Sequence, residues 1–293
     1  MTETIILSGK EVASAVYDDL SSRIDRITSE KVTPGLAAVL VGDDPASQVY
    51  VRNKRRRFEN MGLFGETFRM GEDSSESNVL ALINDLNGDD RFHGILIQLP
   101  LPKGIDSDNL LRSVRPDKDV DGFHPENIGL LAAGNPRFIP CTPKGILRIL
   151  QFYNIETSGK HAVIVGRSNI VGRPMALMLS AKTDTGNATV TVCHSRTPDI
   201  AYYTRQADIV IAAAGMPSLI KGDMIKDGTV IIDVGINRVE DDSKKGYKLS
   251  GDVDYESVMD KASALTPVPG GVGPMTIAML VENTVEAAER LIS

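Results

Sequence analysis

Two long apolar runs stand out in the first half of the chain. Residues 36–42 read LAAVLVG and residues 94–102 read GILIQLPLP, and glycine or proline ends each run. Continuous apolar runs are typical of strands that helices cover on both faces, because such strands have no side that faces solvent. The pattern therefore predicts two buried strands here.

Helical spacing of apolar residues predicts several helices around these strands. Residues 76–88 have this spacing and end in Asn-Gly, which suits the C-terminal end of a helix. We expect another helix to begin near Pro45, and a third to open with Thr142 as its N-cap and Pro143 in its first turn. Residues 274–293 form an amphipathic pattern, and we expect this helix to pack on the first domain.

From residue 161 onward, predicted strands and helices alternate regularly. A helix is expected from Pro174, and the apolar strand segments are residues 161–165, 188–193, 207–215 and 228–235. Such alternation predicts an α/β fold with a parallel, doubly wound sheet. Residues 104–140 and 239–262 are rich in Gly, Pro, Asp and Lys and show poor periodicity, so no element is predicted in them.

Composition narrows the class of protein. The chain has 293 residues, of which 42% are hydrophobic and 24% charged, so we expect a globular protein, with two domains favoured over one. Its net charge of -7 predicts no nucleic-acid partner. The N-terminus shows no targeting segment, and no apolar stretch approaches the roughly 20 residues needed to span a bilayer, so we expect a cytoplasmic location and no membrane association. Cys141 and Cys193 are expected to be reduced and packed.

The segment GRSNIVGRP, residues 166–174, follows an apolar strand and leads into a predicted helix. Backbone N–H groups and the helix dipole at such a turn can hold a phosphate. However, Gly166 and Gly172 do not make the usual G-x-G-x-x-G pattern. Taken alone, the turn supports a dinucleotide site and a ligand-free turn about equally.

The residues after the next strand favour one cofactor over another. An NAD-binding unit normally places Asp or Glu at the end of its second strand, whereas this chain continues VTVCHSRT, residues 190–197. Ser195 and Arg196 can supply a hydroxyl and a cation to a 2'-phosphate, with Arg167 or Arg173 nearby. The sequence therefore predicts NADP rather than NAD.

The segment DKDVDG, residues 117–122, leaves three interpretations open. It begins like a calcium loop, but Ile128 stands where that loop needs Glu and Pro125 interrupts it, so calcium is disfavoured. The aspartates can instead bond neighbouring backbone N–H groups in a turn. A third hypothesis is that Asp121, beside Gly122, recognises the donor edge of a heterocycle.

The basic segment YVRNKRRRFE, residues 50–59, could form either a solvated helix face or part of a chemical site. Tyr50 and Lys54 are four residues apart and share one face of the expected helix, so they can act on one ligand. A solvated face is the preferred interpretation for most of the arginines at positions 52, 55, 56 and 57. The four histidines share no ligand spacing, so no metal site is predicted.

Six motifs occur in order along the chain. They are YVRNK at 50–54, GILIQLPLP at 94–102, DKDVDGFHP at 117–125, PCTPKG at 140–145, GRSNIVGRP at 166–174 and PGGVGPMT at 269–276. Together they closely resemble the bifunctional methylenetetrahydrofolate dehydrogenase/cyclohydrolase (FolD) family, almost from end to end. The resemblance implies NADP-dependent oxidation of 5,10-methylenetetrahydrofolate to the methenyl form, then hydrolysis to 10-formyltetrahydrofolate. The alternatives are a dehydrogenase without the hydrolytic activity and a non-catalytic NADP-sensing protein.

The resemblance also implies a homodimer whose subunit has two α/β domains with a cleft between them. Residues 1–142, completed by the C-terminal helix in 273–293, would form the folate-binding catalytic domain, and residues 143–272 the Rossmann-like, parallel-sheet NADP-binding domain. By similarity, Tyr50, Lys54, Gln98 and Asp121 are catalytic and, with Leu99, Pro269, Gly270 and Gly271, bind the substrate. The cofactor positions implied are Gly166, Arg167, Ser168, Ser195 and Ile236, to which the sequence adds Arg173 and Arg196. Residues 181–188, AKTDTGNA, are longer and more polar than the family pattern and leave the register of Ser195 open.

These residue types suit the hydrolytic step in particular. Water must lose a proton as it attacks the methenyl cation, and a ring nitrogen must gain one as the ring opens, so a group that exchanges protons near neutral pH is required. Burial and neighbouring arginines are both expected to lower the pKa of Lys54, which would suit it to that role. Gln98 is expected to orient Lys54 by a hydrogen bond, and Tyr50 to contact the pterin.

Overall fold

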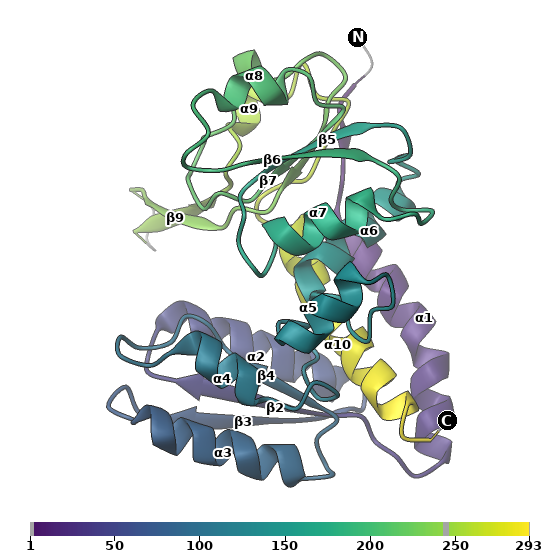
Figure 1. Cartoon of the computed structure of the whole chain (residues 1–293), viewed down its shortest axis with the longest axis vertical. Coiled ribbons are helices and arrows are strands. Elements are labelled where there is room, and N and C mark those ends of the chain that lie inside the picture. The colour runs from purple at the N-terminus through teal and green to yellow at the C-terminus, as the bar shows by residue number, and fades with distance from the viewer. Residues whose placement is uncertain (1–2, 243–245, 293) are drawn as a thin grey trace. The chain divides into compact units, whose positions relative to one another are not determined.

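A computed structural model describes residues 3–242 and 246–292 (Figure 1). Parts of three predicted segments, the N-terminal ten residues, 239–262 and 274–293, therefore lie outside the described residues. Two compact units divide the chain. The six-stranded unit comprises Met1–Ala15 and Thr142–Thr276, and the three-stranded unit comprises Val16–Cys141 and Ile277–Ser293.

The three-stranded unit is built on a small parallel sheet. Its strands are β2 (Gly35–Val41), β3 (Phe64–Met70) and β4 (Gly94–Ile97), in the order β3-β2-β4. Every residue of β2 and β4 is buried, which confirms the two predicted buried strands. Strand β4 is shorter than the apolar run that predicted it, because the strand ends at Ile97 and residues 98–102 lie beyond it. The Leu99–Pro100 peptide bond is cis.

Four helices of this unit surround or follow the sheet. They are α2 (Pro45–Asn60), α3 (Glu76–Gly88), α4 (Ser107–Ser113) and α5 (Pro125–Ala132). Helix α3 packs Val79, Ile83 and Leu86 into the same core as the strands, and Figure 1 shows it lying along the sheet. No element was predicted in the segment 104–140, whose periodicity is poor, yet it contains α4 and α5, short helices whose first turns are capped by Asp106 and His124.

The six-stranded unit contains a larger parallel sheet. Its strands are β1 (Ile5–Ile6), β5 (His161–Val165), β6 (Thr189–Cys193), β7 (Ile209–Ala212), β8 (Val230–Asp233) and β11 (Ala264–Leu265), in the order β1-β11-β8-β7-β5-β6. All described pairs in it are parallel, which confirms the predicted doubly wound sheet. Strand β5 lies between β6 and β7 (Figure 1). The strand that follows β5 in the chain, β6, is therefore added on one side of it, and the later strands β7 and β8 are added on the other side.

Shorter elements complete the six-stranded unit. They are α6 (Cys141–Phe152), α7 (Gly172–Ser180), α8 (Ile200–Thr204), the 3-10 turn η1 (Gly222–Met224), the antiparallel pair β9 (Asn237–Glu240) and β10 (Tyr247–Ser250), and α9 (Tyr255–Val258). Helix α6 begins at Cys141, so Thr142 lies inside the first turn rather than at the predicted N-cap. Its hydroxyl is instead 3.1 Å from that of Thr276.

Two long helices, α1 (Gly9–Ser29) and α10 (Val272–Glu289), contribute residues to both units. Within the three-stranded unit, the Arg23 guanidinium of α1 lies 2.6 Å from the Glu289 carboxylate of α10. Asn283 of α10 donates to the carbonyls of Val120 and Ile139 at 2.7 and 3.0 Å. The C-terminal helix therefore completes this unit, as predicted.

The division into a folate-binding and an NADP-binding domain at residue 142 stays a prediction, because compactness does not say which ligand a unit binds. By contacts alone, residues 1–15 group with the six-stranded unit, where β1 pairs with β11. Within the described residues, no helix has the length and apolar character that crossing a membrane requires.

Candidate active site

Lys54 occupies the core-facing stripe of helix α2. The helix begins where the Asp44 carboxylate accepts from the Ser47 N–H at 2.7 Å, with Pro45 in the first turn. Its buried residues, spaced by three and four, are Ser47, Val51, Lys54 and Phe58. Lys54 is only 5% exposed, so this amine is part of the interior and not of the solvated face.

Three of the predicted site residues meet around the Lys54 amine. Lys54 Nζ donates to Gln98 Oε1 at 3.1 Å and lies 5.3 Å from the centroid of the Tyr50 ring. Gln98 Nε2 in turn donates to the Leu99 carbonyl at 2.7 Å, which directs the amide oxygen of Gln98 toward the amine. The expected hydrogen bond between Gln98 and Lys54 is therefore present, with Leu99 holding the acceptor in place.

Burial and one carboxylate set the electrostatics of this group. Burial lowers the pKa of Lys54, and the negative charge of Asp121 opposes that shift. Burial likewise raises the pKa of Asp121, which Lys54 and a hydrogen bond with the Cys141 thiol oppose. The pKa of Tyr50 is raised by burial and by Asp121. The protein interior thus favours the uncharged form of both the amine and the carboxyl.

The arginines of α2 do not have the predicted effect on Lys54. The shift in the pKa of Lys54 comes from burial, so the prediction that neighbouring arginines lower it was wrong. Arg55 pairs with Glu59 at 2.8 Å, and the Arg57 guanidinium stacks 4.1 Å from the centroid of the Tyr17 ring. Arg52, Arg55 and Arg56 are exposed. A solvated face is thus the correct interpretation for most of this charge run.

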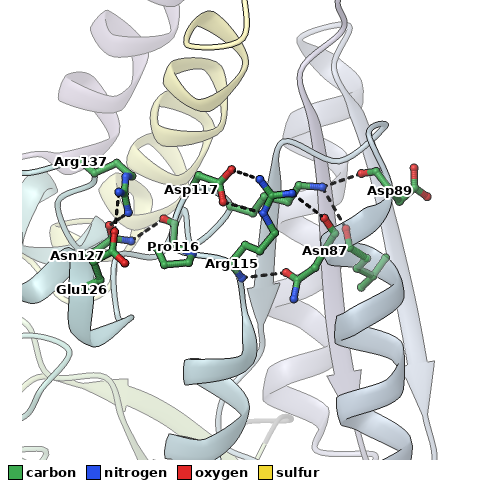
Figure 2. A network of polar contacts seen from close by, with 10 residues as sticks. Asn87, Asp89, Arg115, Pro116, Asp117, Glu126, Asn127 and Arg137 are labelled. Carbon is green, nitrogen blue, oxygen red and sulfur yellow. Dashed lines mark hydrogen bonds and ion pairs between the residues drawn. The ribbon is translucent and has the colours of Figure 1, made fainter.

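The segment DKDVDG is held by turn chemistry. The buried Asp119 carboxylate accepts from the N–H groups of Phe123 and His124 at 3.2 and 2.8 Å and from Asn127 Nδ2 at 2.8 Å. Burial raises the pKa of Asp119 to about 7, against these three donors. Asp117 points away and pairs with Arg115 at 2.5 Å (Figure 2). The described residues hold no cluster of three or more His, Cys, Asp or Glu side chains that could bind a metal ion.

A polar network extends from this turn, as Figure 2 shows. Arg137 donates to Asn127 Oδ1 at 3.1 Å and pairs with Glu126 at 2.6 Å, while Asn127 Nδ2 also donates to the Pro116 carbonyl at 2.9 Å. Asn127 ties the start of the 117–122 segment and the Asp119 carboxylate within it to helix α5. Asp121, whose charge acts on Lys54, belongs to a loop whose other two carboxylates are already engaged.

The turn after β5, in the six-stranded unit, requires its two glycines. Gly166 has a φ of +138°, and a Cβ there would lie 2.1 Å from the Ala213 carbonyl oxygen. A Cβ on Gly172 would lie 2.2 Å from the Gly166 carbonyl oxygen. The Ser168 hydroxyl accepts from the N–H groups of Val171 and Gly172 at 3.1 and 3.4 Å. The result is a tight turn that leads directly into helix α7, and a helix N-terminus is a place where a phosphate can bind.

The other predicted cofactor residues follow neighbouring strands. Val165 pairs with Cys193, and Gly166 N donates to the Cys193 carbonyl at 2.9 Å, so β6 ends level with β5 and Ser195 lies two residues beyond it. The assignment of Ser195 to the family's cofactor position stays a prediction. Exposed Ser195 and Arg196 follow β6, and exposed Arg167 and Arg173 lie in the turn and at the start of α7. Ile236, 52% exposed, follows β8. All of them lie at the carboxyl edge of one parallel sheet, where dinucleotides bind in such folds.

The structure divides the predicted substrate residues between the two units. Tyr50, Lys54, Gln98, Leu99 and Asp121 belong to the three-stranded unit. Pro269, Gly270 and Gly271 belong to the six-stranded unit, immediately before α10, where Gly271 N donates to the Pro267 carbonyl at 2.8 Å. The predicted contact of these three residues with the substrate stays a prediction.

Sequence analysis missed the buried carboxylates of Asp233 and Asp252, which are 4% and 0% exposed. A signal for both of them was present. Asp233 ends the apolar segment VIID before Val-Gly, and Asp252 follows Gly251 in a segment without periodicity. A carboxylate that directly adjoins an apolar strand and glycine is a candidate for backbone hydrogen bonding.

Comparisons with known proteins were made for the whole chain. Residues 7–121 match the family model "Tetrahydrofolate dehydrogenase/cyclohydrolase, catalytic domain", and residues 140–292 match the model of the same family's NAD(P)-binding domain. A relative from Magnetococcus marinus, named bifunctional protein FolD, is 54% identical over 286 residues, covering 97% of each chain.

Solved structures give the same result. The FolD methylenetetrahydrofolate dehydrogenase/cyclohydrolase of Campylobacter jejuni is 49% identical, with a TM-score of 0.92 over 98% of this chain and 99% of that one. The Trypanosoma brucei enzyme, solved with NADP cofactor and an inhibitor, is 36% identical with a TM-score of 0.94, covering 100% of this chain and 99% of that one.

Proposed function

The chain belongs to the tetrahydrofolate dehydrogenase/cyclohydrolase family, and we propose that it oxidises 5,10-methylenetetrahydrofolate with NADP and hydrolyses the product to 10-formyltetrahydrofolate. The family resemblance indicated by the six motifs is confirmed by the match of both family models. The observation that best supports the two-step function is the buried Lys54 amine, hydrogen-bonded to Gln98 and electrostatically coupled to Asp121.

The dehydrogenase step requires little acid–base catalysis by the protein. NADP supplies the hydride acceptor, and the protein mainly binds and orients the reactants. We assign the phosphate-binding role to the turn that begins with Gly166, Arg167 and Ser168, because this turn leads from β5 into the N-terminus of α7, where the helix dipole favours an anion. The preference for NADP over NAD rests on Ser195 and Arg196, with Arg167 and Arg173, at the ends of adjacent elements that carry no acidic residue.

The hydrolytic step uses Lys54. As water adds to the methenyl carbon it loses a proton, and the carbon–nitrogen bond that breaks leaves a ring nitrogen that takes one up; one further proton is released overall. An amine with a lowered pKa can accept the first proton and return it, whereas an ordinary lysine is protonated at neutral pH. In this proposal Gln98 fixes the position of the amine, Asp121 tunes its charge and binds the heterocycle, and Tyr50 contacts the pterin.

Two finer expectations belong to the proposal and rest on the family resemblance: the chain acts as a homodimer, and it acts in the cytoplasm. Light scattering on the purified protein tests the first, with twice the mass of the 31.6 kDa chain expected. A single-chain mass at micromolar concentration would remove the homodimer from the proposal.

A two-wavelength absorbance assay tests the function. The purified protein is mixed with 5,10-methylenetetrahydrofolate and NADP, and NADPH and the methenyl chromophore are followed separately. The proposal predicts NADPH formation together with enzyme-dependent decay of added methenyl substrate. NADPH formation without methenyl decay would identify a dehydrogenase alone, and NADP binding without either signal would identify the non-catalytic alternative.

A further inference from the structure

Two buried carboxylates in the six-stranded unit have no part in the proposed chemistry. Asp233 is the last residue of β8, and Asp252 lies two residues beyond β10. Both side chains are removed from solvent, being 4% and 0% exposed. Carboxylates are rarely buried without hydrogen-bond partners, so the hydrogen bonds of these two side chains indicate their structural role.

Asp252 connects the segments that follow two neighbouring strands. Its Oδ2 accepts from the backbone N–H groups of Ala214 and Gly215, which follow β7, at 2.6 and 2.8 Å. Its Oδ1 accepts from Asn237 Nδ2, at the start of β9 after β8, at 2.9 Å. One carboxylate therefore fixes the backbone beyond β7 and a side chain beyond β8.

Asp233 fixes Asp252 in turn. Asp233 Oδ1 accepts from the N–H groups of Gly235 and Asp252, both at 2.9 Å, and Oδ2 accepts from the N–H of Val253 at 3.0 Å. Every one of these donors is a backbone group. Asp233 thus holds the main chain on which the Asp252 carboxylate is mounted.

Two glycines make room for this arrangement. A Cβ on Gly235 would lie 2.3 Å from Asp252 Oδ1, and a Cβ on Gly251 would lie 1.8 Å from Asp233 Oδ2. Each carboxylate therefore occupies space that any other residue at the facing glycine would fill. We call Asp233, Gly235, Gly251 and Asp252 the carboxylate clamp.

The clamp acts on the part of the sheet where a dinucleotide binds. In a doubly wound sheet that place is the carboxyl edge between the two strands at which the order reverses, here β5 and β7. The segment after β7 borders it directly, because the Ala213 carbonyl abuts Gly166 of the phosphate turn. Met216 and Ile236, which follow β7 and β8, are 55% and 52% exposed at this edge.

We propose that Asp252, supported by Asp233, is a positioning residue for the nicotinamide half of the cofactor. The adenosine half belongs to the β5–β6 side, where the predicted 2'-phosphate ligands Ser195 and Arg196 lie, and the nicotinamide half belongs to the β7–β8 side that the clamp holds. Without the clamp, the segments after β7 and β8 lose the hydrogen bonds that hold them, whereas the segments after β5 and β6, on the adenosine side, keep theirs. The inference rests on the proposed function, since it assumes that NADP is the ligand of this edge.

Binding of a whole and a partial cofactor tests the proposal. Isothermal titration calorimetry at 20 °C is run with NADP and with adenosine 2',5'-bisphosphate, which lacks the nicotinamide half. For Asp252→Ala we expect the Kd for NADP to rise about tenfold or more, the equivalent of one to two hydrogen bonds, with the Kd for the bisphosphate within about twofold of wild type. Asp252→Asn keeps one acceptor oxygen for Ala214 and Gly215, so an intermediate effect on NADP is expected.

A matched control uses the opposite edge of the same sheet. The Asp208 carboxylate accepts from the His161 N–H at 2.8 Å and pairs with Lys226 at 2.6 Å, at the amino ends of β5 and β7. Asp208→Asn should leave both Kd values unchanged. Equal weakening of both ligands by Asp252→Ala, or no weakening in either folded Asp252 variant, overturns the proposal. Failure of the wild-type chain to bind NADP would instead overturn the proposed function.

Discussion

The two units bury charge in different ways. In the three-stranded unit, the Lys54 amine donates to a side-chain amide and interacts electrostatically with the buried Asp121 carboxyl. In the six-stranded unit, Asp233 and Asp252 each accept three hydrogen bonds, and backbone N–H groups make five of the six. Burial favours the uncharged form in both units, lowering the pKa of Lys54 and raising that of Asp233 to about 6.

This difference distinguishes Lys54, which we expect to take part in the reaction, from Asp233 and Asp252, which hold loops in place. A carboxylate held by backbone donors cannot change its hydrogen bonds without moving the main chain, so it fixes loops. An amine held by one amide side chain and a neighbouring charge can gain or lose a proton while the main chain stays in place. The comparison predicts that changes around Lys54 alter rates and pH profiles, whereas changes in the clamp alter cofactor affinity.

The largest expected effect comes from removing the Lys54 amine. Lys54→Met should lower the cyclohydrolase rate by about 10²- to 10⁴-fold, the usual contribution of a general acid–base group, while the Kd for NADP changes less than about twofold. Lys54→Arg is the matched control, because it keeps the cation but not a proton that can be exchanged near neutral pH. Retention of hydrolysis by Lys54→Arg would show that the charge alone matters and that no proton is exchanged.

A third backbone-held carboxylate, Asp119, tests the comparison inside the three-stranded unit. Its pKa is raised from 3.8 to about 7, so its contribution to stability is fully present below pH 3.8 and is lost as the pH rises through about 7. The free energy of unfolding should therefore fall by up to roughly 4 kcal/mol from this group between pH 4 and pH 8.

Urea unfolding of wild type and Asp119→Asn at pH 5, 6, 7 and 8 isolates that contribution. Asn does not titrate, and it cannot accept from all three donors of Asp119, so wild type should be the more stable protein at pH 5. Its advantage should shrink toward pH 8. An advantage that instead grows with pH would mean that the three donors depress the pKa of Asp119 and outweigh its burial.

Opposite changes of charge beside Lys54 should move its pKa in opposite directions. Asp121→Asn removes the charge that raises the pKa of Lys54, so the limb of the cyclohydrolase pH–rate profile that reports Lys54 should move to lower pH. Gln98→Glu places a carboxylate at the acceptor, 3.1 Å from the amine, and should move that limb to higher pH. Shifts of the same sign in both variants would assign the limb to another group.

The smallest effect is expected on the solvated face of α2. Arg52 is exposed and lies two residues from Lys54 on a different face of the helix. Arg52→Gln should change the free energy of unfolding by less than about 0.5 kcal/mol and leave the hydrolytic rate unchanged. A large loss of rate would show that the charge run around Lys54 takes part in the reaction, contrary to the division between the buried stripe and the exposed face.

Hydrophobic pattern predicted the strands and helices with strong local signals. The apolar runs predicted β2, β4, β5, β6, β7 and β8, and Pro45 marked the start of α2. Strands β9, β10 and β11 were not predicted. Helix α1 was not predicted, although Val12, Val16, Leu20, Ile24 and Ile27 have helical spacing and are buried. Helices α4 and α5 were missed for a different reason, because at seven and eight residues each shows too few turns to reveal a period.

Site residues that belong to sequence motifs were predicted, and contacts between residues far apart in the sequence were missed. Tyr50 and Lys54 could be paired from their spacing on one helix, and the family resemblance added Gln98 and Asp121. Their mutual contacts require β4, α2 and the loop before α5 to meet, which no local pattern contains. The clamp depends on Asp252 reaching Ala214, 38 residues away in sequence, so only the folded chain shows it.

The most direct test is an NMR titration of the Lys54 amine in the ligand-free protein, with labelled lysine side chains assigned by comparison with Lys54→Met. We predict a pKa below the ordinary 10.5, which falls further in Asp121→Asn and matches the Lys54 limb of the cyclohydrolase profile. An amine that titrates at or above 10.5, with hydrolysis still dependent on a group near neutral pH, would contradict the role assigned to Lys54.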